Sequence, residues 1–384
     1  TDWKDELFKT GGHQNYQVSV SGGGQNTQFY SSLSYTKQDG IIQNQGLERF
    51  TGNANLTHTF KRLTVQVTSQ FSKMIQKKTN EGTSYDGAVA NYAFFQSPSS
   101  TPYNEDGSLN NGCGMFGVNP LYEFQHSSDR ATIIKAFNTV KATYNIWDNL
   151  NLSEKISYDY MTNTNDVLWD RYSNNGGPGG VMQRIISKNE QLNTQTQLTY
   201  NKAFGEHNID ALLGFETEDN KYAYNYLSGQ DYPGDLYEFT NAGSTSADSN
   251  IQSYRLTSFL GRVNYDFGGK YYLSASYRTD GSSRLARDNR WGSFWSVSGA
   301  WRFTHENFME STKEVLTDGK LRLSYGVNGT QPSVYYGYMN LYKYGQKYNG
   351  ISGMGIIGIA NPDLKWEKNK TFNVGLDLTF LNRF

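Results

Sequence analysis

The chain carries few residues whose types and spacing could support catalysis or hold a cofactor. Gly353-Met-Gly355-Ile-Ile-Gly358 matches the G-x-G-x-x-G pattern of dinucleotide-binding folds. That site needs a preceding strand and a following helix whose N-terminus holds the pyrophosphate. Here IANPDLKW follows, with a proline and no helical period, so the segment is predicted to be an outer loop.

Two groups of oxygen-bearing side chains could bind a cation or act as acids. Asn104, Asp106, Ser108 and Asn110 place oxygens at every second position. The glycine of an EF-hand is misplaced and no acidic residue closes the loop, so this stretch is predicted to be a turn. The acidic residues Glu216 and Glu218 share a strand face at a loop edge. They are interpreted as a solvated rim, in preference to the carboxylate pair of a glycosidase.

Nucleophilic and metal-binding patterns are missing from the sequence. The five histidines are scattered without paired spacing, and no G-x-S-x-G occurs. The single cysteine, Cys113, rules out a disulfide framework or a C-x-x-C site within this chain. The sequence therefore predicts a protein that is not an enzyme and that has no cofactor and no metal.

Composition favours strands with one wet face. Aromatic residues make up 15% of the 384 residues, with 29 Tyr and 21 Phe, and there are 39 Gly but only 7 Pro. Disordered chains are poor in aromatics, so disorder is excluded. The formal net charge of -1 gives no basic excess for nucleic acid. No apolar run approaches the length of a transmembrane helix, and the N-terminus has no signal peptide. We therefore expect a mature chain or an internal fragment.

Alternation of apolar and polar residues recurs from end to end and predicts about thirteen strands. In KYYLSASYR (270–278), for example, Tyr271, Leu273, Ala275 and Tyr277 fall on one face. Many of the strands are about 9–13 residues long, and a tilted membrane strand needs ~9–11. Aromatic residues at strand ends bracket smaller apolar ones, as in the two aromatic girdles of a membrane barrel.

The connections alternate between short and long. Short ones are predicted at 22–26, 60–62, 147–149, 204–207 and 267–270, with a longer, helical one at 304–320. Long ones are predicted at about 76–130, 162–185, 217–253, 279–289 and 328–368, and an intermediate one at 38–48. Outer-membrane barrels have short periplasmic turns and long extracellular loops, and a soluble sandwich has no reason to sort its turns in this way.

Several stretches resemble the SusC/RagA family of TonB-dependent outer-membrane transporters. The most specific is RVNYDFGGKYYLSASYRTDGSSRLARDNRWGSFWSVSGAWRFTHENFM (262–309); KLRLSYGVNGTQ (320–331) and NPDLKWEKNKTFNVGLDLTFLNRF (361–384) are also similar. So are the opening 42 residues and the stretches YNEDGSLNNG (103–112) and NPLYEF (119–124).

The resemblance implies an all-β fold, an antiparallel transmembrane β-barrel of 22 strands closed by a plug. It also implies a bacterial outer-membrane location, a SusD-like lipoprotein lid, and a TonB-type energising complex that acts through the plug. About thirteen strands cannot close such a cylinder. Residues 1–384 are therefore expected to be a partial barrel domain that lacks the plug and the C-terminal strands.

The function implied by the resemblance is TonB-dependent import of a large nutrient, a glycan or oligosaccharide or else a peptide. A passive porin and a soluble β-rich binding or adhesion module are the alternatives. Aromatic rings stack on sugar faces and on peptide side chains, and the expected outer loops are rich in them. The candidate substrate contacts are Trp169, Tyr172, Tyr232, Tyr237, Tyr335 and Tyr336. The alternative for these residues is that they pack the loops together or against the lid.

Overall fold

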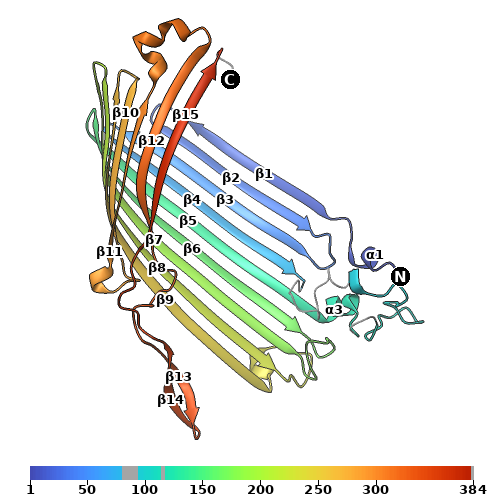
Figure 1. Cartoon of the computed structure of the whole chain (residues 1–384). Helices are drawn as coiled ribbons and strands as arrows, with labels where there is room; N and C mark the ends of the chain where they lie inside the picture. The colour runs from blue at the N-terminus through green and yellow to red at the C-terminus, as the bar shows by residue number, and fades with distance from the viewer. Residues whose placement is uncertain (80–93, 114–116, 382–384) are drawn as a thin grey trace.

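A single antiparallel sheet of thirteen strands dominates the computed structural model, which describes residues 1–79, 94–113 and 117–381 (Figure 1). Each strand pairs with the next in sequence, and the last strand pairs with β12. The sheet consists of β1 (Gly12–Gly23), β2 (Thr27–Asp39), β3 (Gly46–Phe60), β4 (Leu63–Lys78), β5 (Ser127–Trp147), β6 (Leu150–Trp169), β7 (Val181–Phe204), β8 (His207–Gln230), β9 (Ser244–Phe267), β10 (Tyr271–Ser282), β11 (Trp291–Trp301), β12 (Leu316–Thr330) and β15 (Glu367–Phe380). The predicted fold class and strand number are confirmed.

The register of the sheet sorts apolar and polar residues onto opposite faces. Ala275 on β10 lies opposite Val263 on β9 and Val297 on β11. Its neighbour Ser274 lies opposite Asn264 and Ser298. A slip of one residue would exchange the two faces, so the alternation in the sequence excludes it.

The apolar face has no protein layer over it among the described residues. Leu273 is 53% exposed and Val297 is 45% exposed, although both lie mid-strand. A β-sandwich would bury these side chains under a second sheet. The buried apolar cluster is small and lies at one end of the sheet; it consists of Trp3, Leu7, Ile42, Cys113, Val118 and Leu121. This arrangement contradicts the soluble-sandwich alternative and fits a face that is solvated by lipid.

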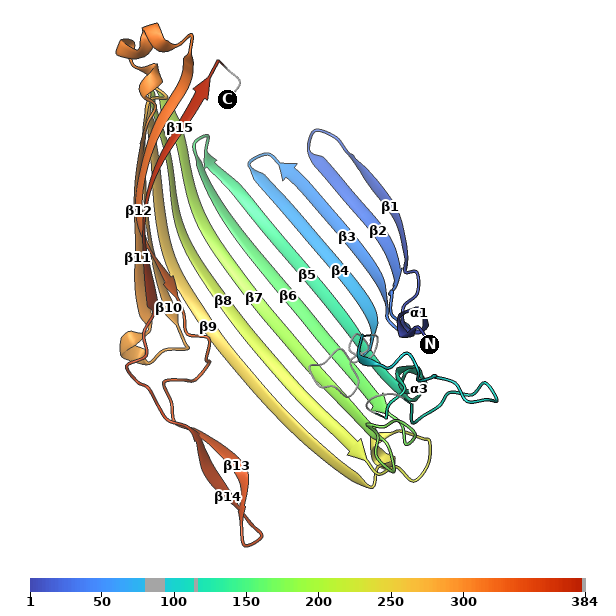
Figure 2. The same cartoon turned by 45° about the vertical axis from the view of Figure 1, so that its right-hand side comes forward.

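The sheet curves from β1 to β15 like part of a cylinder wall and stays open (Figure 2). In the described part of the chain, β1 and β15 each pair on one side only. Full closure would be needed to remove these two edges.

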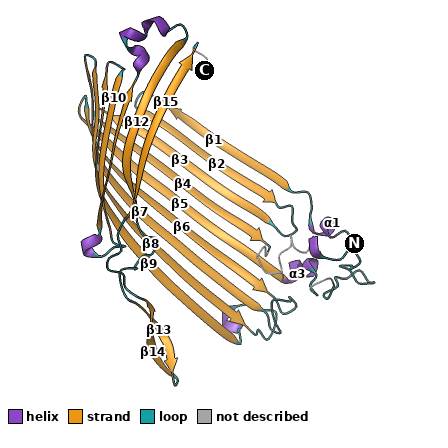
Figure 3. Cartoon of the chain, viewed as in Figure 1, coloured by secondary structure: helices purple, strands orange, loops and turns teal. Residues whose placement is uncertain are grey.

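The two ends of the sheet differ as predicted (Figure 3). Five connections at one end are very short, at 24–26, 61–62, 148–149, 205–206 and 268–270. The sixth connection at that end is expected to be helical, and it does form two short helices, η3 (Phe303–His305) and η4 (Asn307–Thr312). The other end carries α1 (Trp3–Leu7), α3 (Pro120–His126), η1 (Phe239–Asn241), η2 (Arg287–Asn289) and the longer loops. None of the helices in the described part is long and apolar enough to cross a membrane.

Five strands, β5 to β9, are much longer than predicted, and β5 and β6 have 21 and 20 residues. Strands β7, β8 and β9 have 24 residues each, which is about 80 Å along the strand. The predicted loops 162–185 and 217–253 are therefore wrong in extent, because the actual loops cover 170–180 and 231–243. A strand that rises out of the membrane has water on both faces, so its alternation of apolar and polar residues disappears.

Two local predictions concern the long loops. The stretch 104–110 is a turn, as expected, because Tyr103 and Leu109 form a bridge and Asn104 N donates to the carbonyl of Ser108 over 2.8 Å. The segment with Gly353, Gly355 and Gly358 is expected to be irregular, but it forms β14 (Ile351–Gly358), paired with β13 (Leu341–Tyr348) in a separate hairpin. No helix follows β14 in the described residues, so the structure does not support a dinucleotide site there.

Candidate functional site: the concave face and its loops

The polar face of the sheet lines a hollow of about 990 Å³ near the short-turn end. Its walls come from β7 to β12 and from β15, and they include Asn201, Asp210, Asn264, Ser274, Ser298, Arg322 and Asn373. These are the residues that alternate with the apolar ones, so the polar side of the pattern faces the concave side of the sheet.

Hydrogen bonds across strands hold the side chains of this hollow in place. Asn264 Nδ2 donates to Asp210 Oδ1 over 3.0 Å, and Ser274 Oγ donates to Asn264 Oδ1 over 2.6 Å. Arg322 lies 2.7 Å from Asp377 on the neighbouring strand. The resulting surface offers amides, hydroxyls and balanced charges to a ligand.

A second polar cluster lies higher on the same face, around Arg278 on β10. Its guanidinium contacts Glu216 at 2.8 Å and Asp280 at 2.7 Å, and it donates to Ser258 Oγ over 2.9 Å. Glu218 accepts a hydrogen bond from Tyr254. The residues Glu216 and Glu218 are therefore bound to neighbours on the barrel wall, which differs from the predicted solvated rim and also from a free acid pair.

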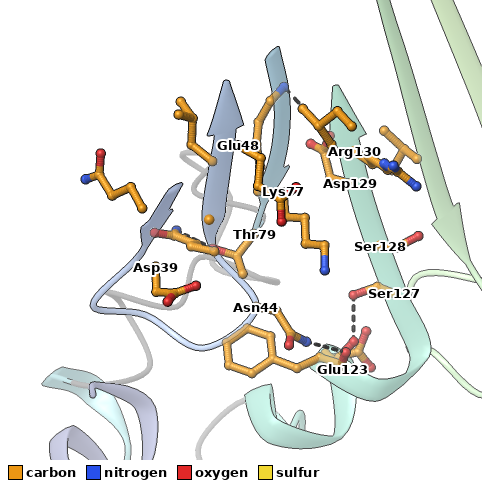
Figure 4. A pocket seen from close by; sticks show the side chains of 18 of the residues that line it. Asp39, Asn44, Glu48, Lys77, Thr79, Glu123, Ser127, Ser128, Asp129 and Arg130 are labelled. Carbon is orange, nitrogen blue, oxygen red and sulfur yellow. Dashed lines mark hydrogen bonds and ion pairs between the residues drawn. The ribbon is translucent and has the colours of Figure 1, made fainter. Parts of the chain in front are cut away.

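A second hollow, of about 960 Å³, lies at the loop end between the ends of β2 to β6 and α3 (Figure 4). Its walls carry Asp39, Glu48, Lys77, Asp129 and Arg130, among others. The loop 40–45 is attached to α3, because Asn44 Nδ2 donates to the carbonyl of Phe124 over 2.7 Å.

The candidates Trp169 and Tyr172 lie at the end of β6 and in the loop that follows it. Trp169 ends β6 and lines the hollow. Tyr172 is 52% exposed, and its ring centroid lies 5.4 Å from that of His126. His126 Nδ1 in turn lies 2.7 Å from Asp170 Oδ2. Of the two candidates, Trp169 lines the hollow and Tyr172 has an exposed ring beside His126.

The candidates Tyr232 and Tyr237 fasten two loops to each other. Tyr232 is only 3% exposed, and its ring lies 5.1 Å from that of Tyr237. Arg171 donates its backbone N–H to the Tyr237 hydroxyl over 3.0 Å and its Nη2 to the carbonyl of Tyr232 over 2.9 Å. These two tyrosines hold loop 231–243 against loop 170–180, which is the packing alternative.

The candidates Tyr335 and Tyr336 fasten a third loop to the sheet. The Arg284 guanidinium lies 4.0 and 4.4 Å from the ring centroids of Tyr254 and Tyr335, and these two rings meet each other edge to face with their centroids 5.7 Å apart. The Tyr336 hydroxyl accepts from Ser253 N over 3.0 Å. The six candidates therefore form separate clusters and do not converge on one binding site.

Comparison with known proteins decides the family. Residues 100–384 match the family described as TonB dependent receptor-like, beta-barrel. The chain belongs to the TonB-dependent receptor β-barrel family. This membership confirms the outer-membrane location that the sequence resemblance implies.

Within the TonB-dependent receptors, the relatives confirm the resemblance to SusC and RagA. The chain is 28% identical to TonB-dependent receptor SusC of Bacteroides thetaiotaomicron and 29% identical to TonB-dependent receptor P3 of Formosa agariphila. All of this chain is covered in both cases, but only 41% and 40% of those proteins. A solved structure of the RagAB peptide transporter superposes with a TM-score of 0.88 at 23% identity, over 99% of this chain and 44% of that one. The chain thus spans about two fifths of the length of these curated receptors.

Several residues that make contacts across this receptor wall are not identified by the sequence analysis. Arg278 and Asp280 stand two residues apart on one strand face, which is a signal for a charged pair on the lumen side. Arg284 gave no local signal, because its partners Tyr254 and Tyr335 lie 30 and more positions away in the sequence. The described residues hold no group of acidic, histidine or cysteine side chains that could bind a metal.

Proposed function

We propose that residues 1–384 are one continuous part of the barrel domain of a TonB-dependent importer, and that its cargo is a glycan or oligosaccharide. The observation that carries this proposal is the hollow of about 990 Å³ on the concave face. Its lining offers amides and hydroxyls, and its cations Lys202 and Arg322 are matched by the anions Asp210 and Asp266. A neutral polyhydroxylated molecule makes many hydrogen bonds to such a surface and needs no charged partner.

Transport then needs no covalent chemistry by this chain. Weak and repeated hydrogen bonds along the wall let a large solute move without being trapped, as conduction through any selective pore requires. A SusD-like lipoprotein lid would capture the substrate outside, and a TonB-type complex would supply the energy through a plug. Both partners belong to the proposal, as does contact of the apolar face with lipid.

A peptide is the second candidate substrate. The RagAB protein, whose fold this chain shares, is a peptide transporter, and peptide backbones use the same hydrogen-bonding groups as sugars do. A binding site for peptides would be expected to hold the charges of the two termini, and Arg322 of the hollow is already paired with Asp377.

The test is uptake by a strain that lacks the gene encoding this chain. Loss of uptake of defined oligosaccharides, with oligopeptide uptake unchanged, would support the glycan proposal. The opposite selectivity would favour the peptide. Uptake that persists after the TonB-type complex is deleted would instead identify a passive porin, and unchanged uptake of every solute would refute the importer.

A matched pair of variants links uptake to the hollow. Asn264→Leu removes an amide that accepts from Ser274 and donates to Asp210, and it should reduce the rate of uptake several-fold. Val263→Leu, on the adjacent outward position, should leave the rate unchanged.

A further inference from the structure

Three tyrosines stand in a row near the loop end of β8. Tyr222, Tyr224 and Tyr226 alternate along a strand that pairs with both neighbours without a register shift. They therefore share the face that lines the hollow of about 990 Å³, which is the concave face of the sheet. Successive tyrosines are two strand steps apart, about 6.8 Å, so the row extends over about 13 Å.

The side chains of this row are not engaged by the protein. In the part of the chain that the structure describes, none of the three makes a side-chain hydrogen bond, an ion pair or a ring contact, and each is partly exposed. Other tyrosines of this region are engaged, since Tyr254 donates to Glu218 and the Tyr232 ring packs against that of Tyr237. The rings and hydroxyls of the row are therefore available to a ligand.

The surroundings of the row are almost free of charge. Its cross-strand neighbours are Ile185, Ser187 and Asn189 on β7 and Asp248, Asn250 and Gln252 on β9. At the same height the convex face is charged, because Lys188 contacts Glu190 at 2.9 Å and Asp219 contacts Arg255 at 2.6 Å. These ion pairs place the row above the lipid-facing band. Both faces meet water there, so solvation alone does not explain why charge is kept from the concave one.

Aromatic rings with amides beside them suit a neutral sugar chain. A ring packs against the apolar C–H face of a sugar, and an Asn or Gln amide both donates and accepts, as sugar hydroxyls do. Asn189 and Gln252 flank Tyr222 on its two sides. The same strand carries Asp210 of the hollow, so a chain that leaves the row along β8 reaches the hollow.

We propose that Tyr222, Tyr224 and Tyr226 form a track that binds a neutral oligosaccharide at successive sugars and guides it toward the hollow. The inference rests on the proposed importer and assigns its glycan contacts near the loop end of the wall. Like rings at a regular spacing match a polymer of like units, and several weak contacts of one kind let the chain move on.

Two other ligands fit the track less well. The flanking residues include one acid, Asp248, and no cation, so they offer nothing to an anionic glycan. A peptide backbone would bind by adding a strand at a free sheet edge, but β8 is already paired with β7 and β9 on its two sides. A peptide would have to rely on its varied side chains, which do not present the same group to each ring.

The experiment measures dissociation constants by calorimetry on the full-length transporter in detergent. The probes are the disaccharide and the hexasaccharide of the neutral glycan that the deletion strain no longer imports. Tyr222→Ala, Tyr224→Ala and Tyr226→Ala combined should raise the dissociation constant of the hexasaccharide about tenfold or more, because three stacking contacts are lost. The same variant should raise that of the disaccharide by less than about threefold, because the shorter chain reaches fewer rings.

Two control variants are matched to this one. The three tyrosines changed together to Phe keep their rings and should bind the hexasaccharide within about threefold of the unmodified transporter. Asn225→Ala, which lies between Tyr224 and Tyr226 on the convex face, should change neither constant.

The possible results separate the track from the importer. Unchanged binding of the hexasaccharide by the alanine variant, or no binding by the unmodified transporter, overturns the track alone, since uptake is measured independently. Equal weakening for both sugars also overturns it, because a row of rings must favour the longer chain. Import of every oligosaccharide by the deletion strain refutes the proposed function, and the track with it.

The nature of the contact is tested by the same variants. Binding by the phenylalanine variant as weak as that of the alanine variant would assign the contacts to the hydroxyls and refute stacking. An oligopeptide that binds the unmodified transporter and loses affinity in the alanine variant, with hexasaccharide binding unchanged, would make a peptide the occupant and refute the glycan track.

Discussion

The lipid-facing role of the apolar face predicts opposite outcomes for arginine at two adjacent positions. Val297 and Ser298 are consecutive on β11 and point to opposite faces. Trp291 and Trp301 mark the ends of the strand on the outward face. Ten steps of about 3.3 Å at a tilt of about 40° span about 25 Å, the height of the apolar band of a membrane barrel. Val297 therefore lies close to the bilayer midplane.

Val297→Arg should then destabilise the folded protein by about 2 to 4 kcal/mol, the cost of arginine at the midplane of a barrel wall. Ser298→Arg points into the hollow of about 990 Å³, where there is room and water. It should change the free energy of unfolding by about 0.5 kcal/mol or less. The conservative Val297→Leu serves as a folding control and should be near neutral.

The assay is urea unfolding of the full-length protein in lipid bilayers, followed by tryptophan fluorescence. Equal stability of Val297→Arg and Ser298→Arg would refute the assignment of the two faces. So would a larger loss for Ser298→Arg, because the hydrocarbon would then lie on the side that we assign to water.

Three further predictions concern the loops and the short-turn end. Gly180 has φ +82°, and a Cβ there would lie 2.6 Å from the Tyr237 ring, whereas Gly177 has φ +61° and open space around it. Gly180→Ala should therefore lower the free energy of unfolding by about 1 kcal/mol or more beyond the effect of Gly177→Ala. The same unfolding assay measures both variants. Arg284→Ala should speed protease cleavage of segment 331–366 several-fold. Arg284→Lys should speed it less, since a lysine keeps the charge but lacks the planar guanidinium that contacts both rings. Equal cleavage of all three proteins would count against this contact. Glu306 accepts hydrogen bonds from Tyr271 and Trp301 and lies near Lys270, and these contacts lower its pKa. Ionised Glu306 therefore stabilises the fold above its unfolded pKa of about 4.3, and this stabilisation is lost as the pH falls through the lower pKa of the folded state. The melting temperature should accordingly fall less in acid for Glu306→Gln than for the unmodified protein.

The membrane part of the fold could be predicted from the sequence because each strand there has two different solvents. Leu273 and Ser274 had to face opposite sides, and this requirement excludes a one-residue slip against β9 and β11. Above the membrane the same physics fails. In β8 the polar run 217–221 carries no apolar alternation and predicts a loop, although the tyrosines at 222, 224 and 226 do alternate beyond it.

The loop contacts could not be predicted for a different reason. Tyr232 is buried because Arg171, 61 residues earlier, fastens its backbone, and nothing in the local sequence distinguishes such a tyrosine from an exposed one. The hairpin β13–β14 was missed because glycines at 345, 350, 353, 355 and 358 are typical of irregular loops. Gly345 and Gly350 do have φ of 87° and 79°, and they lie at the bulge and the turn of the hairpin.

These loop contacts bear on where selectivity can arise. Tyr232, Tyr237, Tyr335 and Tyr336 are engaged in holding loops to each other or to the wall, so substitution there would change loop geometry before it changed any direct contact with cargo. Tyr172 is different, since its ring stays exposed beside that of His126 in the loop that follows β6. A variant Tyr172→Ala that alters which solute is taken up, while Tyr237→Phe leaves the choice of solute unchanged, would place selectivity at that loop. The reverse result would mean that the loops select through their arrangement, with the tyrosine clamps as its determinants.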